Sequence, residues 1–210
     1  VISTKLLLAK ENKELAGTKV AIQGMGNVGS NAAKIFYHRD AKVIAISDVS
    51  GGLYCEEGLD IDTICTFLES TGKLLKDYEA DGVSHISNAE VLTCECDVLV
   101  PAALENQITA DNASELRCKY IVEAANGPTT EEADKILEKR GITVVPDIFA
   151  NSGGVIVSYF EWVQNIQSVS WTEEEVNAKL ERIMNNSFEA VYNIAQEKKV
   201  PLRTGAYLIA

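Results

Sequence analysis

The chain has 210 residues, 46% of them hydrophobic and 24% charged, and its formal net charge is −12 at pH 7. This composition excludes a disordered chain and provides enough apolar material for one folded domain, or two at most. The negative charge and the lack of a basic run disfavour nucleic acid and anionic membranes as partners. No apolar stretch is long enough to span a bilayer and the first residues lack the features of a signal peptide, so we expect a cytoplasmic protein.

The predicted elements alternate between strands and helices as far as residue 151. A helix over 1–16 comes first, and the strands follow at 20–23, 43–47, 98–100, 120–123 and 143–145, with a weak one at 84–87. Helical patterns lie between them at 28–38, 60–70, 109–116 and 130–140, the last opened by a threonine cap at Thr130. Such alternation predicts an α/β fold with a doubly wound, mostly parallel sheet and helices on both faces.

After Asn151 the strand pattern stops, and the remainder is predicted to be helical. Helices are expected at 152–167, at 172–197 with Thr172 and Glu175 as its capping pair, and at 203–210. Four aromatic residues of this part are expected to pack in the core, namely Tyr159, Phe160, Trp162 and Trp171. With few prolines and no low-complexity linker, we expect a single domain over 1–210, made of a helix at 1–16, a sheet core at 18–151 and a helical tail at 152–210.

A glycine-rich turn directly follows the first predicted strand. It has the form Gly-x-Gly-x-x-Gly, with Gly24, Gly26 and Gly29 separated by Met25, Asn27 and Val28, and a helix follows it. Gly24 suits the tight turn, Gly26 the close approach of a pyrophosphate, and Gly29 the close packing of helix on strand. The free amides and positive dipole end of the helix attract phosphate. This context predicts a Rossmann-type dinucleotide site.

An acid stands at the end of the second predicted strand. Asp48 lies 19 residues after Gly29, where a carboxylate can accept hydrogen bonds from the adenosine ribose and repel a 2′-phosphate, which favours NAD over NADP. Two alternatives stay open. Asp48 could simply cap a turn before Gly51-Gly52, and Ser47 with Ser50 could hold the 2′-phosphate of NADP if the carboxylate turned away.

Small and amide side chains follow three further strands. Ala102, Ala103, Asn126 and Asn151 all come after predicted carboxyl ends, where an open α/β sheet binds its ligands. The small side chains leave room for a flat ring, and an asparagine amide offers both a donor and an acceptor to a carboxamide. Asparagine is also an ordinary turn residue, so each one alone is a weak signal.

The predicted helix after Asn151 extends this group. Val155 and Ser158 follow Asn151 at the i+4 and i+7 positions, so the three side chains share one helix face. An amide, an aliphatic group and a hydroxyl on one stripe near the ligand end of the sheet suit the wall of a site. A serine that bonds its own helix backbone is the alternative for Ser158.

Five cysteines, at positions 55, 65, 94, 96 and 118, occur without a secretory context. Their odd number and this context predict reduced thiols rather than a disulfide framework. Cys94-Glu95-Cys96 lacks two further ligands at workable spacing for zinc, so no metal site is predicted.

Longer segments of the sequence match a known family. They closely resemble the C-terminal cofactor domain of the glutamate dehydrogenases, whose superfamily includes the leucine, phenylalanine and valine dehydrogenases. The matching segments cover nearly the whole chain and are 15–17, 20–29, 47–48, 100–108, 123–130, 146–147, 151–155 and 158–165.

The resemblance implies oxidative deamination of L-glutamate to 2-oxoglutarate and ammonia with hydride transfer to NAD or NADP, in a cytoplasmic homo-oligomer that is a hexamer in the full-length family. A hydroxyl at Ser158 suits the γ-carboxylate of glutamate, whereas branched-chain and aromatic members are apolar there. The resemblance implies that residues 24–29 hold the diphosphate and that Asp48 binds the ribose. It also implies that the nicotinamide is bordered by Ala102, Ala103, Asn126 and Asn151, and that the substrate is contacted by Val155 and Ser158.

In the family, the catalytic lysine and aspartate belong to an N-terminal substrate domain that has no counterpart in this sequence. We therefore assign no catalytic residue here and expect the chain to bind the cofactor without turning over substrate. Two alternatives remain: the cofactor domain of a branched-chain or aromatic amino-acid dehydrogenase, and a non-catalytic nucleotide-sensing domain. A sensor would leave Asn151 and Ser158 without a role.

Overall fold

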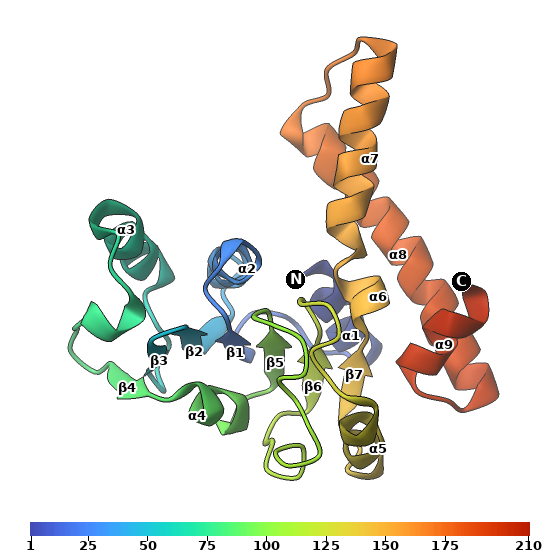
Figure 1. Ribbon diagram of the computed structural model, residues 1–210. Helices are drawn as coiled ribbons and strands as arrows, with labels where there is room; N and C mark the ends of the chain where they lie inside the picture. Colours follow the sequence, from blue (N-terminus) through green and yellow to red (C-terminus); the bar gives the residue numbers. More distant parts are fainter.

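The computed structural model describes residues 1–210 and contains a seven-stranded sheet (Figure 1). β3 is antiparallel to β2 and β4 to β3, whereas all other neighbours pair in parallel. The predicted doubly wound, mostly parallel α/β fold is confirmed. From edge to edge, the strands are β4 (Ser84–Ile86), β3 (Gly51–Tyr54), β2 (Lys42–Asp48), β1 (Lys19–Gln23), β5 (Val98–Pro101), β6 (Tyr120–Val122) and β7 (Thr143–Val145).

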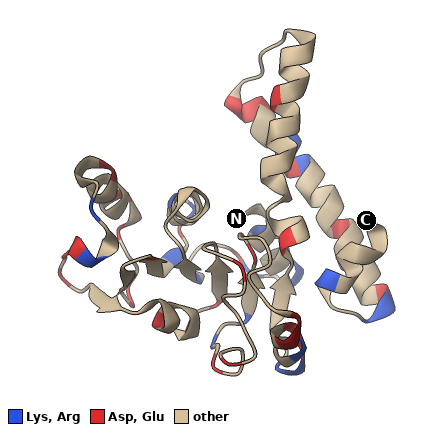
Figure 2. Cartoon of the chain, viewed as in Figure 1, with Lys and Arg blue, Asp and Glu red and all other residues tan.

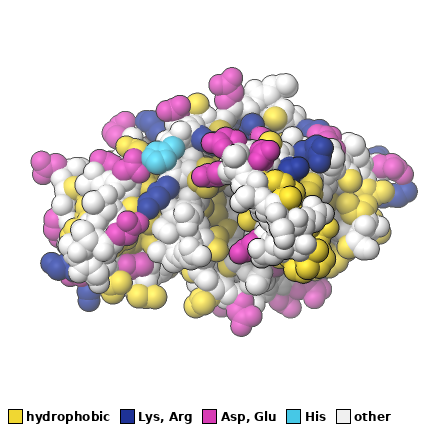
Figure 3. All heavy atoms as spheres, turned by 90° about the horizontal axis from the view of Figure 1, so that it is seen from above, with side chains coloured by type: hydrophobic (Ala, Val, Ile, Leu, Met, Phe, Trp, Pro, Cys, Tyr) yellow, Lys and Arg dark blue, Asp and Glu magenta, His cyan; other side chains and the backbone are white.

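The strand order reverses at β1. From β1 the chain moves to β2 on one side, and it later returns to the other side of β1 with β5. In open α/β sheets, ligands bind in the crevice outside the carboxyl ends of the strands at such a reversal. The arrows of β5 and β7 point upward in Figure 1, so the carboxyl edge of the parallel strands lies at the top of that view. Seen from above, the molecule is hollowed near its middle, with hydrophobic side chains at the bottom of the hollow (Figure 3).

Helices cover both faces of the sheet, with α2 and α3 on one face and α4 and α5 on the other (Figure 1). None of the helices combines the length and the hydropathy that a bilayer crossing requires. Their bounds are α1 (Ile2–Lys10), α2 (Asn27–Tyr37), α3 (Ile61–Thr71), α4 (Asn88–Thr93), α5 (Glu131–Lys139), α6 (Asp147–Ala150), α7 (Ser152–Gln167), α8 (Glu173–Lys198) and α9 (Leu202–Ile209), with a 3₁₀ turn, η1, at Leu75–Asp77.

Two hydrophobic cores form because successive strand residues point to opposite faces. Val20 and Ile22 of β1 belong to a core that includes Phe36 of α2. Ala21, between them, belongs to a second core with Leu137 of α5. All three of these β1 residues are fully buried, so β1 is central to both cores and holds the turn that follows it in a fixed place.

The helix caps predicted from the sequence are confirmed. The hydroxyl of Thr130 accepts a hydrogen bond from the backbone N–H of Ala133 at the start of α5. Thr172 and Glu175 form a reciprocal capping box at the start of α8. Figure 2 shows acidic residues at the beginning of α8 and a basic one at its end, the arrangement that the helix dipole favours.

Two predicted helices differ from the structure. The first helix ends at Lys10 rather than near residue 16. Residues 109–116 form turns instead of a helix, because the Asn112 side chain accepts from the N–H of Thr109 and donates to the carbonyl of Gln107. The Arg140 guanidinium also donates to the carbonyls of residues 113 and 116.

Helices α7 and α8 project together from the carboxyl edge of the sheet (Figure 1). The prediction that Tyr159, Phe160, Trp162 and Trp171 are core residues is therefore wrong for two of them. Tyr159 and Trp162 are 58% and 57% exposed and stack on each other with ring centroids 5.8 Å apart. Phe160 is buried and meets Trp171 edge to face. Because α7 extends beyond the sheet, other elements pack against only one of its sides.

Candidate functional site

The glycine turn lies between β1 and α2 and is tightly packed at two of its three glycines. Gly24 has a φ of +100°, and a Cβ there would lie 2.8 Å from the backbone nitrogen of Ala103. A Cβ on Gly29 would lie 1.7 Å from the carbonyl oxygen of Gly24. Gly24 therefore makes the tight turn, and Gly29 lets α2 pack against the end of β1, as the sequence predicted.

The third glycine faces open space. A Cβ on Gly26 would meet no atom within 4 Å, and Gly26, Asn27 and Val28 are exposed. Gly26 is the N-cap of α2, and no side chain caps that end. The first bonded amide of the helix is that of Ser30, 2.9 Å from the carbonyl of Gly26. The amides before it have no protein partner, which suits an anion.

The segments that follow β5 and β6 are joined to this turn by backbone hydrogen bonds. The N–H of Ala102 donates to the carbonyl of Gln23 over 2.8 Å. The N–H groups of Ala124 and Ala125 both donate to the carbonyl of Pro101, over 3.1 and 2.9 Å. The small residues thus form one continuous strip along the carboxyl edge of the sheet, beside the glycine turn.

The two predicted asparagines meet at the end of this strip. Nδ2 of Asn151 donates to Oδ1 of Asn126 over 2.7 Å, although the residues follow different strands. Asn126 is exposed and Asn151 half-buried, so the pair faces solvent. The free Nδ2 of Asn126 and Oδ1 of Asn151 remain as a donor and an acceptor for a ligand.

Val155 and Ser158 lie on α7, one and two turns beyond Asn151. Both side chains are exposed, and Val155 is 74% exposed. Ser158 makes no hydrogen bond to its own helix through its hydroxyl, unlike Ser152, whose Oγ donates to the carbonyl of Phe149. The two side chains are therefore available to a molecule outside this chain.

Asp48 ends β2 and holds the turn that follows it. Its Oδ1 accepts from the N–H and hydroxyl of Ser50, at 2.6 and 2.5 Å, and its Oδ2 accepts from the N–H of Leu75 at 2.8 Å. A carboxylate has about four acceptor positions, so one remains for a ribose hydroxyl. With the carboxylate in this position, the Ser50 hydroxyl is bonded to Asp48 and Ser47 is fully buried, so neither serine presents a hydroxyl to a 2′-phosphate.

Several polar residues of this edge were missed in the sequence. Gln23 is 2% exposed, and its Nε2 donates to Oε1 of Gln107 over 2.9 Å. Glu123 is fully buried at the end of β6 and bonds to Arg203 and to the backbone of Asp147. An acid next to an apolar strand could have signalled a buried ion pair, but its partner lies 80 residues away in the sequence.

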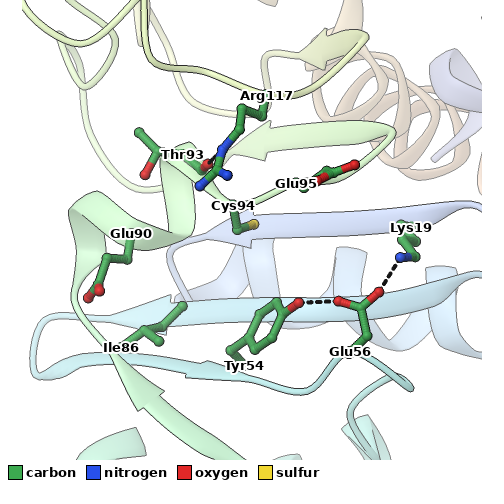
Figure 4. Close-up of a pocket in the computed structure, with 9 residues that line it drawn as sticks. All are labelled: Lys19, Tyr54, Glu56, Ile86, Glu90, Thr93, Cys94, Glu95 and Arg117. Atoms are coloured by element: carbon green, nitrogen blue, oxygen red, sulfur yellow. Dashed lines mark hydrogen bonds and ion pairs between the residues drawn. The ribbon is translucent and has the colours of Figure 1, made fainter.

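A cavity of about 420 Å³ lies at the other edge of the sheet, beside Lys19 at the start of β1 (Figure 4). Two of its charged groups are bonded to each other, since Glu56 pairs with Lys19, and Glu56 also accepts from the hydroxyl of Tyr54. The hydrogen bond to Glu56 raises the pKa of Tyr54 to about 12. No predicted site residue lines this cavity, so it is separate from the glycine turn.

The cysteines are all free, as the sequence predicted, and Cys65, Cys96 and Cys118 are buried. Burial raises the pKa of the Cys118 thiol to about 12. The Cys94 thiol lines the cavity beside Lys19 and donates to the carbonyl of Val91 over 3.3 Å.

Comparisons with known proteins agree with the sequence and the fold. Residues 1–210 match the family described as Glutamate/Leucine/Phenylalanine/Valine dehydrogenase. An NAD-specific glutamate dehydrogenase of Staphylococcus aureus is 47% identical over 209 residues, which are 100% of this chain and 50% of that protein. A cryptic catabolic NAD-specific glutamate dehydrogenase of Bacillus subtilis is 48% identical over 208 residues, 99% of this chain and 48% of that protein.

Solved structures give the same result. A hetero-hexameric glutamate dehydrogenase from Thermus thermophilus, in a leucine-bound form, superposes with a TM-score of 0.89 at 33% identity. The match covers 98% of this chain and 48% of that one. The chain thus spans about half the length of the curated relatives that it matches.

Proposed function

Because the chain belongs to the glutamate/leucine/phenylalanine/valine dehydrogenase family, we propose that residues 1–210 act as one domain, the NAD-binding half of a glutamate dehydrogenase. The glycine turn carries this proposal. Its two packed glycines fix the turn, whereas Gly26 leaves open space in front of the uncapped end of α2. That space fits a diphosphate, and a Cβ with any branch would fill it.

The residues along the carboxyl edge fit the rest of the dinucleotide. The amides at the start of α2 would hold the diphosphate, and the remaining acceptor position of Asp48 would hold a ribose hydroxyl. The strip with Ala102 and Ala103 leaves room for a flat ring, and the Asn126–Asn151 pair offers a donor and an acceptor to its carboxamide.

When bound, the nicotinamide would supply the hydride acceptor for oxidation of L-glutamate to 2-oxoglutarate and ammonia. This chain's contribution is to bind and orient, because none of the residues assigned to the nicotinamide side, Ala102, Ala103, Asn126 and Asn151, is a lysine or an acid. Val155 and Ser158 would contact the substrate side chain, and the Ser158 hydroxyl suits a γ-carboxylate. Proton transfer would fall to the part of the enzyme outside this chain, so the chain alone should bind cofactor without turnover.

The parent enzyme is proposed to be a cytoplasmic homo-oligomer. The number of subunits is proposed to be six, as in the Thermus thermophilus enzyme, which is a hetero-hexamer. One observation supports the compartment and another supports the assembly. Free cysteines suit a reducing compartment. The exposed apolar residues of α7, which include Trp162 and Ile166, suit a surface that another part of an assembly covers.

Calorimetric titration of the chain with NAD and with NADP tests the cofactor assignment. We expect NAD to bind at least tenfold more tightly, because Asp48 both accepts from the ribose and repels a 2′-phosphate. In Asp48→Asn, which removes the charge, the preference should fall to within about threefold. Asp81→Asn, at an exposed acid without a hydrogen-bond partner, serves as the control. Tighter binding of NADP to the unaltered chain would contradict the assignment.

A further inference from the structure

A partly buried ion-pair network lies behind the asparagine pair. Glu123, at the end of β6, is fully buried, and its Oε1 accepts from Nη2 of Arg203 in α9 over 2.7 Å. Arg203 also pairs with Asp134 of α5 and approaches Asp147 of α6, with Nη1 3.5 Å from Oδ1. Burial alone would lower the pKa of Arg203, but the hydrogen bonds to Glu123 and Asp134 outweigh it and raise the pKa. The guanidinium therefore stays charged between three carboxylates.

The same carboxylates hold the two segments that carry the asparagines. Oε2 of Glu123 accepts from the backbone N–H of Asp147 over 2.8 Å, which fixes the start of α6. Oδ2 of Asp147 accepts from the backbone N–H of Gly127 over 2.8 Å, which fixes the segment after β6. The carbonyl of Asp147 accepts from the N–H of Asn151 over 3.0 Å. Each asparagine is thus within one residue of a group that the network holds.

We propose that Arg203, Glu123 and Asp147 are positioning residues that hold the Asn126–Asn151 pair in the geometry that binds the nicotinamide half of the dinucleotide. This inference rests on the proposed function. None of the three side chains belongs to the strip that would contact the cofactor. Their effect is transmitted through backbone N–H groups, so it should be confined to that half of the ligand. The adenosine diphosphate half lies at the glycine turn and Asp48, which have no bond to the network.

The difference between the two halves provides the test. Calorimetric titration with NAD and with ADP gives the ratio of the two affinities for each variant. In Arg203→Met, which keeps the length of the side chain and removes the guanidinium, NAD affinity should fall about tenfold while ADP affinity stays within twofold. General loss of structure would lower both affinities together. Arg182→Met, at an exposed arginine of α8 without an ion pair, is the matched control and should change neither.

Asp147→Asn is the second variant, because it leaves the Glu123–Arg203 pair intact and decides the question if Arg203→Met does not fold. It should show the same selective loss of NAD affinity, since an amide is a weaker acceptor for Gly127 and Arg203. An unchanged NAD to ADP ratio in the folded variants, or an equal loss of both ligands, would overturn this inference alone. Failure of the unaltered chain to bind NAD would overturn the proposed function, and this inference with it.

Discussion

Gly26→Val is expected to weaken NAD binding at least 100-fold while the chain stays folded. The added side chain meets no protein atom, because a Cβ at Gly26 has nothing within 4 Å. It does fill the space in front of the free amides of α2, where the diphosphate must approach the backbone. The variant therefore separates the binding surface from the fold.

Calorimetry with NAD and the thermal unfolding midpoint together check this prediction. Gly26→Ala should give an intermediate loss of affinity, because a methyl group fills less of the space. Ala190→Val, which adds a branched side chain at an exposed position of α8, should leave the NAD affinity unchanged and lower the unfolding midpoint only slightly, because valine is the weaker helix former by about 0.5 kcal/mol. If Gly26→Val bound NAD as tightly as the unaltered chain, the glycine turn would not be the site of the diphosphate.

Gly29→Ala is expected to destabilise the fold, in contrast to the change three residues earlier. Its methyl group would lie 1.7 Å from the carbonyl oxygen of Gly24, so α2 must move away from β1. Overpacking of this kind costs about 2 to 3 kcal/mol. For a chain of this length, that cost lowers the thermal midpoint by roughly 5 to 10 °C.

Gly154→Ala is the control for this prediction, because Gly154 lies in α7 and a Cβ there meets nothing within 4 Å. Alanine is the better helix former by about 1 kcal/mol, so this variant should be as stable as the unaltered chain or slightly more stable. Chemical denaturation of both variants measures the difference. Equal stabilities for Gly29→Ala and Gly154→Ala would show that α2 does not pack on the turn as the structure has it.

The elements that the sequence predicted well are those whose signals are local. The glycine turn, the threonine caps of α5 and α8, and the apolar strands β1 and β2 each depend on a few neighbouring residues. β3 was missed because Gly51-Gly52 is typical of a turn. In the structure Gly52 is a strand residue whose missing side chain makes room for Val91 of α4, since a Cβ would lie 2.7 Å from Val91 Cγ2. Only the tertiary packing explains this glycine.

Helix α4, which the sequence analysis did not predict, and the helix wrongly predicted at 109–116 show what a local pattern leaves open. α4 begins with a capping box formed by Ser87 and Glu90, a local signal that the sequence does contain but that opens a helix of only six residues. Residues 109–116 have a helical pattern, yet their carbonyls are bonded by Arg140, which lies 24 to 27 residues away. Within the segment, the Asn112 side chain bonds the backbone of residues 107 and 109 and competes with the helix.

The candidate site divides in the same way. The sequence predicts which residues follow the strands, and the structure shows that Asn126 and Asn151 meet. The sequence does not predict which side chains hold the two asparagines in place, because Arg203 bonds to Glu123, Asp134 and Asp147, which lie 56 to 80 residues away. The turn-capping role that the sequence offered for Asp48 is present, because its carboxylate accepts from the N–H groups of Ser50 and Leu75.

The central claim is that the free amides at the start of α2 bind the diphosphate of NAD. An NMR titration of the ¹⁵N-labelled chain with NAD tests it most directly, because each backbone amide reports separately. We expect the largest shift changes at the amides of Gly26, Asn27, Val28 and Gly29, with smaller ones near Asp48 and Asn151. Saturable shifts confined to other parts of the chain, with these four amides unmoved, would contradict the account.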